Sequence, residues 1–293
     1  MTLGRLTLLP QRDAAEVAVT PILPSEPELP PVEDVSVARM AKGGRWRTEA
    51  MRSYDRPVLI WFTRGQGRLS VAGRRSGYSP HNLVFLPAKT MHGFSASGPV
   101  LGSVVFLSNA PDFDWPVDPL HLRLQQVQVQ RELTGMIDAI QAEAASGCSH
   151  SNRALLHHVG LLSVWLARTA DAYDDAAQGA QATQIDTSAH RLTRAFTSLV
   201  ERDFRKTDGV QHYAALLGVT PTHLTRVCRK VSGRPALDIL TDRRHFEAKR
   251  LLRDSKIQIA EIARQCGFSS PAYFTRAFRA HTGNSPSEFR SSS

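Results

Sequence analysis

The sequence has few cysteines and no long apolar run, and both absences narrow the class of protein. Its 293 residues include three cysteines, Cys148, Cys228 and Cys266, with no Cys-x-x-Cys pair. This spacing fits neither a disulfide framework nor a zinc site, so we expect reduced thiols in a cytoplasmic protein. No apolar stretch approaches the ~18 residues that span a bilayer, and the N-terminus lacks a signal-peptide core. We therefore expect neither a membrane partner nor export.

Acidic residues are scarce in the last third of the chain. From residue 185 onward there are 19 Lys and Arg against 10 Asp and Glu, whereas residues 1–184 carry 17 of each kind. The whole formal charge of +9 therefore lies in the C-terminal segment. Since the length favours two domains with separate cores, this imbalance predicts a polyanion-binding domain joined to a neutral one.

One short pattern occurs twice within the basic segment. The stretch 213–229 recurs as 261–279, with Ala, Gly and Thr or Ser at matched positions. The alanine lets a second helix approach closely, and Gly218 and Gly267 can end the first helix in a left-handed conformation. The hydroxyl residues that follow can cap the next helix. Each copy therefore predicts a helix-turn-helix unit.

The second helix of each unit has polar residues outside its apolar stripe. Short polar side chains and guanidinium groups suit base edges and phosphates in a major groove. The alternative is a helical hairpin with a solvated basic face. The predicted DNA-contacting residues are Thr222, Thr225, Arg226, Arg229, Ala272, Thr275, Arg276 and Arg279.

Residues 189–293 resemble the DNA-binding domain of the AraC/XylS family of bacterial transcription regulators. The resemblance rests on the Gly-Phe-Ser turn at 267–269, the linking-helix sequence 248–252 and the closing segment 282–290. It implies two helix-turn-helix units, at about 211–231 and 259–282, and one rigid helix that holds them together. It further implies that, of the residues above, Arg229 and Arg279 contact phosphates and the other six reach bases.

Two regions of different composition precede this domain. Five prolines between residues 21 and 31 exclude a regular helix, so residues 1–36 are expected to form an extended arm. The arm is either an ordinary tail or, as in this family, a segment that contacts the ligand or the DNA-binding domain. Residues 37–115 contain short β-branched and aromatic runs bounded by Gly, Pro and Asn, which predict a small barrel.

The region 37–115 resembles the cupin-like effector domain that precedes many AraC-type modules. The resemblance rests on the Gly-Gln-Gly-Arg sequence at 65–68 and on Leu-Pro through Met-His at 86–92. A metal-dependent cupin enzyme would need a His-x-His pair with a downstream Glu and a further His. His81 and His92 stand alone, so we expect no metal, no cofactor and no catalytic residue. Stoichiometric iron or manganese in the purified protein would revive the alternative of an enzyme.

Residues 116–173 are expected to form two helices. Leu155, Val159, Leu162 and Leu166 make an apolar stripe at helical spacing, which either packs on the barrel or forms a homodimer contact. The family favours the dimer. Residues 174–188 are expected to be a linker to the DNA-binding domain at 189–293. The predicted fold class is therefore α+β: a cupin-like β-barrel with two trailing helices, then an all-α double helix-turn-helix domain.

The arginines of the barrel region indicate an anionic effector. Arg-x-x-x-Arg at 64–68, followed by Ser70 and Gly73, resembles part of the PilZ signature for cyclic di-GMP, although Arg68 stands where that signature has Asp or Asn. The alternative effectors are an aromatic or other small carboxylate and a sugar. A further alternative is that no ligand binds and that the arginines are solvated residues flanking an ordinary hairpin turn. The predicted ligand-binding residues are Arg64, Arg68, Arg74, Arg75 and His92.

These observations predict a ligand-responsive, DNA-binding transcription regulator. We expect an activator, which would also contact RNA polymerase, and a mechanism in which the effector favours one arrangement of domains or subunits over another. The competing function is a ligand-free architectural DNA-binding protein.

Overall fold

The computed structural model describes residues 32–40, 42, 44–109, 113–179 and 188–291. The predicted arm lies outside the described residues except for its end, where residues 32–36 form a strand. Short helices α1 (Val37–Met40) and α2 (Trp46–Glu49) follow that strand. The strands are β1 Val32–Ser36, β2 Val58–Arg64, β3 Gly67–Val71, β4 Arg74–Tyr78, β5 Asn82–Leu86, β6 His92–Ala96, β7 Leu101–Leu107 and β8 Leu120–Arg123.

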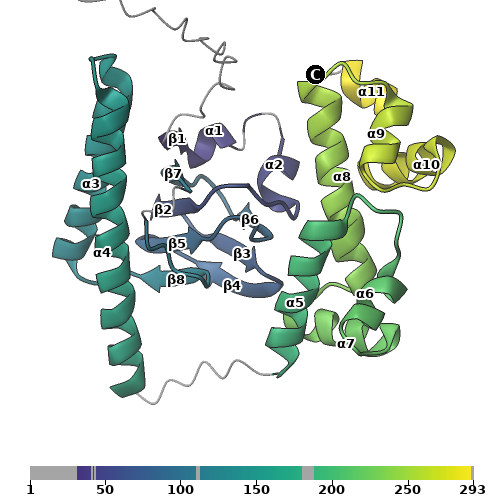
Figure 1. The fold of residues 1–293 in the computed structure, drawn as a ribbon, viewed down its shortest axis with the longest axis horizontal. Coiled ribbons are helices and arrows are strands. Elements are labelled where there is room, and N and C mark those ends of the chain that lie inside the picture. The colour runs from purple at the N-terminus through teal and green to yellow at the C-terminus, as the bar shows by residue number, and fades with distance from the viewer. Residues whose placement is uncertain (1–31, 41, 43, 110–112, 180–187, 292–293) are drawn as a thin grey trace, which may run out of the picture. The chain divides into compact units, whose positions relative to one another are not determined.

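The eight strands form two antiparallel sheets, which we call the β-domain (32–123) (Figure 1). The larger sheet has the order β1-β7-β2-β5-β8 and the smaller one the order β4-β3-β6. Val58, Ile60 and Phe62 of β2 face the core between the sheets, while Leu59 and Trp61 face the opposite side. Because alternate residues of a strand point to opposite faces, a strand covered on both faces reads as one continuous apolar run.

The outer face of the larger sheet is covered by two long helices, α3 (Val127–Ser146) and α4 (Ser151–Gly179) (Figure 1). Leu155, Val159, Leu162 and Leu166 of α4 are buried in one cluster with Leu59 and Phe85 of the sheet. The apolar stripe that suggested a dimer contact therefore packs within the chain itself. A different face of α4 is left exposed.

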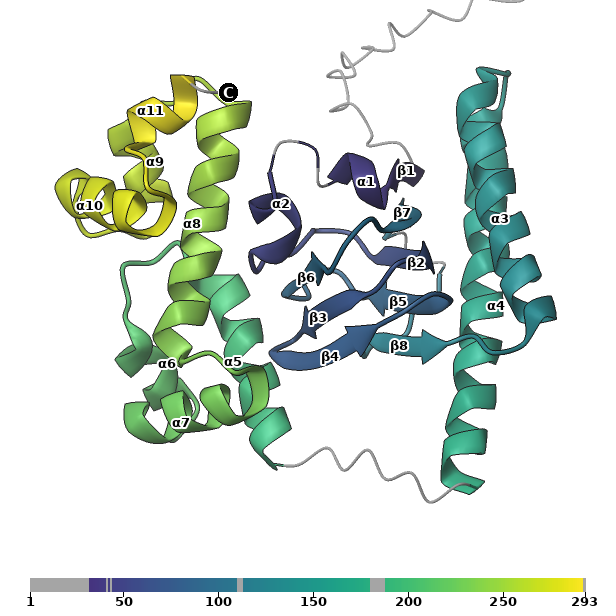
Figure 2. The ribbon, with the colours of Figure 1, turned by 180° about the vertical axis from the view of Figure 1, so that it is seen from behind.

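The C-terminal part is entirely helical, and one long helix runs past both of its halves (Figure 2). Ile239 and Leu240 of that helix, α8, lie in the core of the first half, whereas Ala248 and Leu252 lie in the core of the second. The fold class predicted from the sequence is thus confirmed. The helices are α5 Ser188–Asp203, α6 Val210–Leu216, α7 Pro221–Ser232, α8 Ala236–Asp254, α9 Ile259–Gln265, α10 Pro271–Thr282 and α11 Pro286–Ser291.

The β-domain and the first helical half share part of one core. Met51 and Met91 of the β-domain are buried in the same cluster as Phe196 of α5 and Leu224 of α7. The amide of Met51 also donates a hydrogen bond to Asp242 of α8 at 2.9 Å. Among the helices of the described residues, none is long and apolar enough to cross a membrane.

Candidate nucleic-acid interface

The first helix-turn-helix unit, HTH1, consists of α6 and α7. Gly218 in the turn has a φ of +66°, a left-handed conformation that costs glycine little. The amide of His223 donates a hydrogen bond of 3.2 Å to the side chain of Thr220, which caps α7 and contributes about 1 kcal/mol. Leu224 and Cys228 are fully buried and fix the rotation of α7. Thr222, Arg226, Arg229 and Lys230 of α7 therefore face outward.

The second unit, HTH2, consists of α9 and α10 and is built in the same way. Gly267 has a φ of +74° in the turn, and the amide of Tyr273 donates to the side chain of Ser270 at 3.2 Å. Phe274 and Phe278 are fully buried beneath α10. The glycine turns and hydroxyl caps predicted from the repeat are thus confirmed in both units.

The eight predicted DNA-contacting residues divide equally between α7 and α10, and none is buried. Thr225 is half-buried, and the other seven residues are exposed. The structure therefore brings each predicted set of four together on one helix face.

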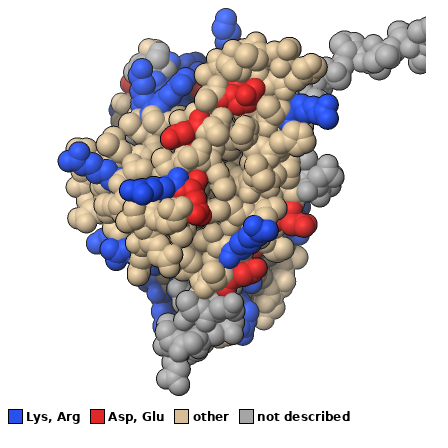
Figure 3. Space-filling model, turned by 90° about the vertical axis from the view of Figure 1, so that its left-hand side faces the viewer, with Lys and Arg blue, Asp and Glu red and all other residues tan. Residues whose placement is uncertain are grey.

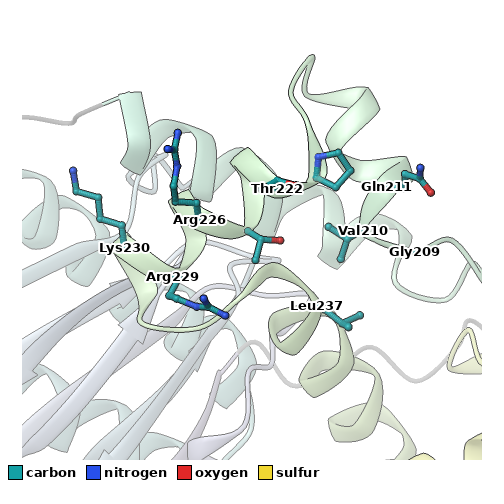
Figure 4. Close-up of a pocket in the computed structure, with 10 residues that line it drawn as sticks. Gly209, Val210, Gln211, Thr222, Arg226, Arg229, Lys230 and Leu237 are labelled. Carbon is teal, nitrogen blue, oxygen red and sulfur yellow. The ribbon is translucent and has the colours of Figure 1, made fainter.

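HTH1 has an open cleft of about 880 Å³ in front of α7 (Figure 4). In this view Arg226 and Lys230 project side by side, whereas Arg229 points toward Leu237 at the start of α8. A guanidinium nitrogen of Arg226 lies 3.2 Å from the ring Nδ1 of His223. The described residues that line the cleft are Gly209, Val210, Gln211, Pro221, Thr222, Thr225, Arg226, Arg229, Lys230 and Leu237.

Two further residues of the recognition faces were missed from the sequence. Lys230 lines the HTH1 cleft one residue after the predicted Arg229. Tyr273 is 51% exposed on α10, at the position matched by His223 in the repeat. The signal was present in both cases, because an Arg-Lys pair at a predicted helix end and an aromatic residue beside a predicted base contact are visible without a structure.

A buried arginine holds α8 against α5 and so fixes the platform that carries both units. Arg243 donates to Glu201 of α5 at 2.7 and 3.0 Å and to Glu247 at 3.3 Å. Its guanidinium carbon lies 3.9 Å from the ring centroid of Phe204. Burial alone would raise the pKa of Glu247, but the hydrogen bond from Arg250 and the charge of Arg243 lower it to about 2. The cluster therefore stays ionised at neutral pH.

The five predicted ligand-binding residues of the β-domain do not converge on one site. Arg68 and Arg75 line an open cleft of about 580 Å³, whereas Arg74 lines a separate cavity of about 330 Å³. Arg64 is exposed and is not among the residues that line either space. His92 is buried. The reason is strand geometry: adjacent residues such as Arg74 and Arg75 point to opposite faces, which an Arg-rich segment of sequence does not reveal.

His92 lies beside Arg52, a residue that the sequence reading missed. Arg52 is fully buried; it donates to the Tyr54 hydroxyl at 3.0 Å and to the Thr48 carbonyl at 2.6 Å. Burial, and then the charge of Arg52, lower the pKa of His92 to about 3, so the imidazole is neutral. Arg52 Nη2 and His92 Nε2 have no hydrogen-bond partner among the described residues. Within those residues, no group of three or more His, Cys, Asp or Glu side chains could hold a metal ion.

Comparison with known proteins gives a family match and several relatives that are similar over part of their length. Residues 213–292 match a family model described as a helix-turn-helix domain. HTH-type transcriptional regulator GlxA of Rhizobium meliloti is 33% identical over 129 residues, 44% of this chain and 40% of that protein. The arabinose operon regulatory protein of Salmonella typhimurium is 39% identical over 72 residues, 25% of this chain and 26% of that protein. Probable transcription factor PqrA of Proteus vulgaris is 30% identical over 104 residues, 35% of this chain and 85% of that protein.

The chain belongs to the AraC/XylS family of transcription regulators. Its relatives are transcription regulators with a helix-turn-helix domain, which favours a DNA-binding regulator over the metal-dependent enzyme. The match spans less than half the length of GlxA and about a quarter of the arabinose regulator. Conclusions drawn from those relatives therefore concern the DNA-binding half.

Proposed function

We propose that this AraC/XylS protein is a transcription activator that binds two adjacent major-groove segments and responds to a small anion held by the β-domain. The observation that carries the proposal is the shared platform: α7 and α10 present matched recognition faces, and both pack on α8. Since α8 is clamped to α5 through Arg243, the two faces are held as one reading unit. In this role the protein acts in the cytoplasm, where it meets DNA and RNA polymerase.

Base and phosphate contacts divide by position on the recognition helices. Thr222, Thr225 and Arg226 of HTH1 are proposed to reach bases, as are Ala272, Thr275 and Arg276 of HTH2. Arg229 and Arg279, one turn further along each helix, are proposed to contact phosphates. A guanidinium that forks onto guanine contributes about 1 to 3 kcal/mol of discrimination, whereas a phosphate contact contributes almost equally on any sequence.

Selection of binding sites from random DNA, followed by footprinting, tests this function. We expect an enriched site with two protected segments about one helical turn apart. The Arg226→Ala variant should bind the selected site with an affinity lower by about tenfold or more. Its affinity for random DNA should change little. Failure to enrich any sequence would contradict the proposal and favour an architectural DNA-binding protein.

The homodimer is proposed to form through the exposed face of α4. Leu156, Leu161 and Val164 are 38%, 64% and 48% exposed there. Figure 3 views the molecule from the side of α3 and α4, where charged residues are scattered over a surface of mostly other residue types. Sedimentation of Leu161→Asp/Val164→Asp should show a folded monomer. Leu162→Asp is the contrasting variant, because Leu162 is fully buried and a charge there should unfold the protein. An unchanged dimer in the folded double variant would place the dimer contact elsewhere.

The effector is proposed to be a small organic anion. The arginines of the β-domain support this, because Arg64, Arg68, Arg74 and Arg75 lie on the adjoining strands β2, β3 and β4. Cyclic di-GMP stays as a second candidate on one observation, the cleft that Arg68 and Arg75 share. Calorimetry with cyclic di-GMP on the wild type and on Arg68→Ala/Arg75→Ala decides between them. Undiminished binding by the double variant, or no heat from the wild type, would remove cyclic di-GMP.

A further inference from the structure

The contact between Arg226 and His223 on α7 defines which tautomer the imidazole adopts. A guanidinium nitrogen of Arg226 lies 3.2 Å from Nδ1 of His223. A guanidinium group has only N–H donors, so it cannot accept a hydrogen bond. Nδ1 is therefore the acceptor, which requires a neutral imidazole with its proton on Nε2. The contact is a hydrogen bond from a charged arginine to an uncharged ring.

His223 is anchored in the first turn of α7. Its amide donates the hydrogen bond to Thr220 that caps the helix. Residues three apart on a helix are neighbours on its surface, so the ring of His223 lies on the same face as Arg226. His223 is half-buried, whereas Arg226 is exposed and lines the open cleft of HTH1. An anchored ring therefore supports the guanidinium at the wall of the cleft.

The uncharged partner distinguishes Arg226 from other arginines on helix surfaces. Arg264 pairs with Glu261 three residues before it, and Arg250 pairs with Glu247 at the same spacing. Within the described part of the chain, Arg226 forms no ion pair. A carboxylate would order the guanidinium but also cancel its charge and compete with DNA for its donors. The imidazole orders it, leaves the charge intact and uses only one of its N–H groups.

HTH2 has no equivalent contact. Tyr273 occupies the position matched to His223 in the repeat, and Arg276 occupies the position matched to Arg226. Among the residues that the structure describes, Arg276 makes no hydrogen bond or ion pair. Its side chain can sample many rotamers, and ordering them on binding costs entropy. Arg226 has given up part of that freedom before DNA arrives.

We propose that His223 is a positioning residue for sequence readout, which holds the Arg226 guanidinium ready for a base of the HTH1 half-site without neutralising it. The inference rests on the proposed function, because that function assigns Arg226 to a base. A guanidinium that forks onto guanine needs one defined orientation, whereas a phosphate accepts hydrogen bonds from many directions. Restricting the rotamers of Arg226 beforehand therefore favours guanine over phosphate.

Binding of two His223 variants to the site selected from random DNA tests the proposal. His223→Leu removes the acceptor and should lower the affinity for the selected site by about three- to tenfold, with a smaller effect on random DNA. His223→Asn should restore most of the affinity, because its Oδ1 takes the place of Nδ1 and can accept the same hydrogen bond. Both variants should melt cooperatively, since the helix cap uses only the backbone amide of His223. Equal losses of affinity in the two folded variants would overturn the inference.

A double-mutant cycle separates positioning from a direct contact of His223 with DNA. In the Arg226→Ala background, His223→Leu should cause almost no further loss of affinity for the selected site. The matched control combines Tyr273→Leu with Arg276→Ala, and here the two losses should add, because no contact joins the side chains. Additive losses for His223→Leu and Arg226→Ala would overturn the inference and show that His223 contacts DNA itself.

NMR relaxation of arginine side chains in the DNA-free protein gives a measurement that does not depend on the proposed function. The order parameter of the Arg226 Nε–H group should exceed that of Arg276 in the wild type and should fall in His223→Leu. Equal order parameters for the two arginines in the wild type would contradict the inference. An ordered Arg226 with no sequence enriched from random DNA would trace the failure to the proposed function instead.

Discussion

HTH1 and HTH2 have the same backbone plan but different recognition surfaces. Both have a left-handed glycine in the turn, a hydroxyl cap and two arginines one turn apart. At the other matched positions HTH1 has Thr222, His223 and Lys230, where HTH2 has Ala272, Tyr273 and Ala280. The comparison shows that HTH1 presents hydrogen-bonding and charged groups, whereas HTH2 presents methyl groups and an aromatic ring at the matched positions. We therefore expect the two units to recognise DNA by different chemistry.

The two units also differ in what supports them. The core beneath HTH1 includes Met51 and Met91 of the β-domain, whereas the buried cluster beneath HTH2 contains residues of the C-terminal helices alone. The aromatic ring of Trp46 and an ion pair between Arg47 and Asp254 contact the HTH2 side at its edge. We therefore expect an effector bound by the β-domain to act on HTH1 first and to reach HTH2 through α8.

The largest expected effect is a difference in stability between alanine substitutions at the two turn glycines, Gly218 and Gly267. A Cβ on Gly267 would lie 2.4 Å from the Phe204 carbonyl and 2.5 Å from the Lys206 carbonyl, whereas a Cβ on Gly218 would meet nothing within 4 Å. Gly218→Ala should cost only the left-handed conformation, about 1 to 2 kcal/mol. Gly267→Ala should cost more than that, because backbone atoms must also move. Urea unfolding of both variants measures the difference, and equal losses would show that the contact of HTH2 with the 204–206 loop is not rigid.

The free energy of unfolding should also depend on pH, in part through a histidine on the HTH2 side. His245 of α8 is buried there and stacks on His281 at 4.3 Å; burial, and then His281 and Lys249, lower its pKa to about 3. The unfolded chain takes up a proton near pH 6.5 while the folded chain does not. Stability should therefore fall between pH 6.5 and 3, by at most about 1.4 kcal/mol per pH unit for this group.

Urea unfolding as a function of pH tests the role of His245. In His245→Gln the slope below pH 6.5 should decrease by about that amount, while the contribution of His92 stays. An unchanged slope would show that His245 is protonated in the folded protein.

The apolar surface of HTH2 predicts a dependence on thymine methyl groups. Ala272 and Tyr273 are exposed at the start of α10, where they can contact the C5-methyl group in the major groove. Replacing thymine by deoxyuridine in the HTH2 half-site should cost up to about 0.8 kcal/mol per contacted methyl group. The same replacement in the HTH1 half-site should cost less. If competition binding shows a larger loss of affinity for deoxyuridine in the HTH1 half-site, the predicted difference between the two units is wrong.

The smallest effect concerns Lys230. If its ammonium group contacts a phosphate, Lys230→Ala should reduce the magnitude of the slope of log K against log salt by about 0.9. It should weaken binding to all DNA sequences alike. Ala280→Lys makes the matched change on HTH2 and should raise the slope by a similar amount. A loss confined to the selected site would show that Lys230 contacts a base instead.

The sequence predicted the helical half far better than the effector site. The repeat predicted the turns at Gly218 and Gly267, because capping and turn chemistry are local. The eight residues proposed to contact DNA stay a prediction. The apolar strands β2 and β5 were also predicted from the sequence. The strand β4, with the sequence Arg-Arg-Ser-Gly-Tyr, was not, because it is largely exposed and has no apolar alternation. The cavity beside α5 depends on which residues of β3, β4 and β8 face inward, and that is decided by pairing between distant segments.

The central claim is that each recognition helix reads its own half-site from a common platform. Binding of the wild type, Arg226→Ala and Arg276→Ala to the selected site, and to versions with one half-site scrambled, tests it directly. The loss of affinity caused by Arg226→Ala should disappear when the HTH1 half-site is scrambled and persist when the HTH2 half-site is scrambled. The loss of affinity caused by Arg276→Ala should show the reverse pattern. Losses that do not depend on which half-site is scrambled would contradict the claim and show that both arginines contact only the DNA backbone.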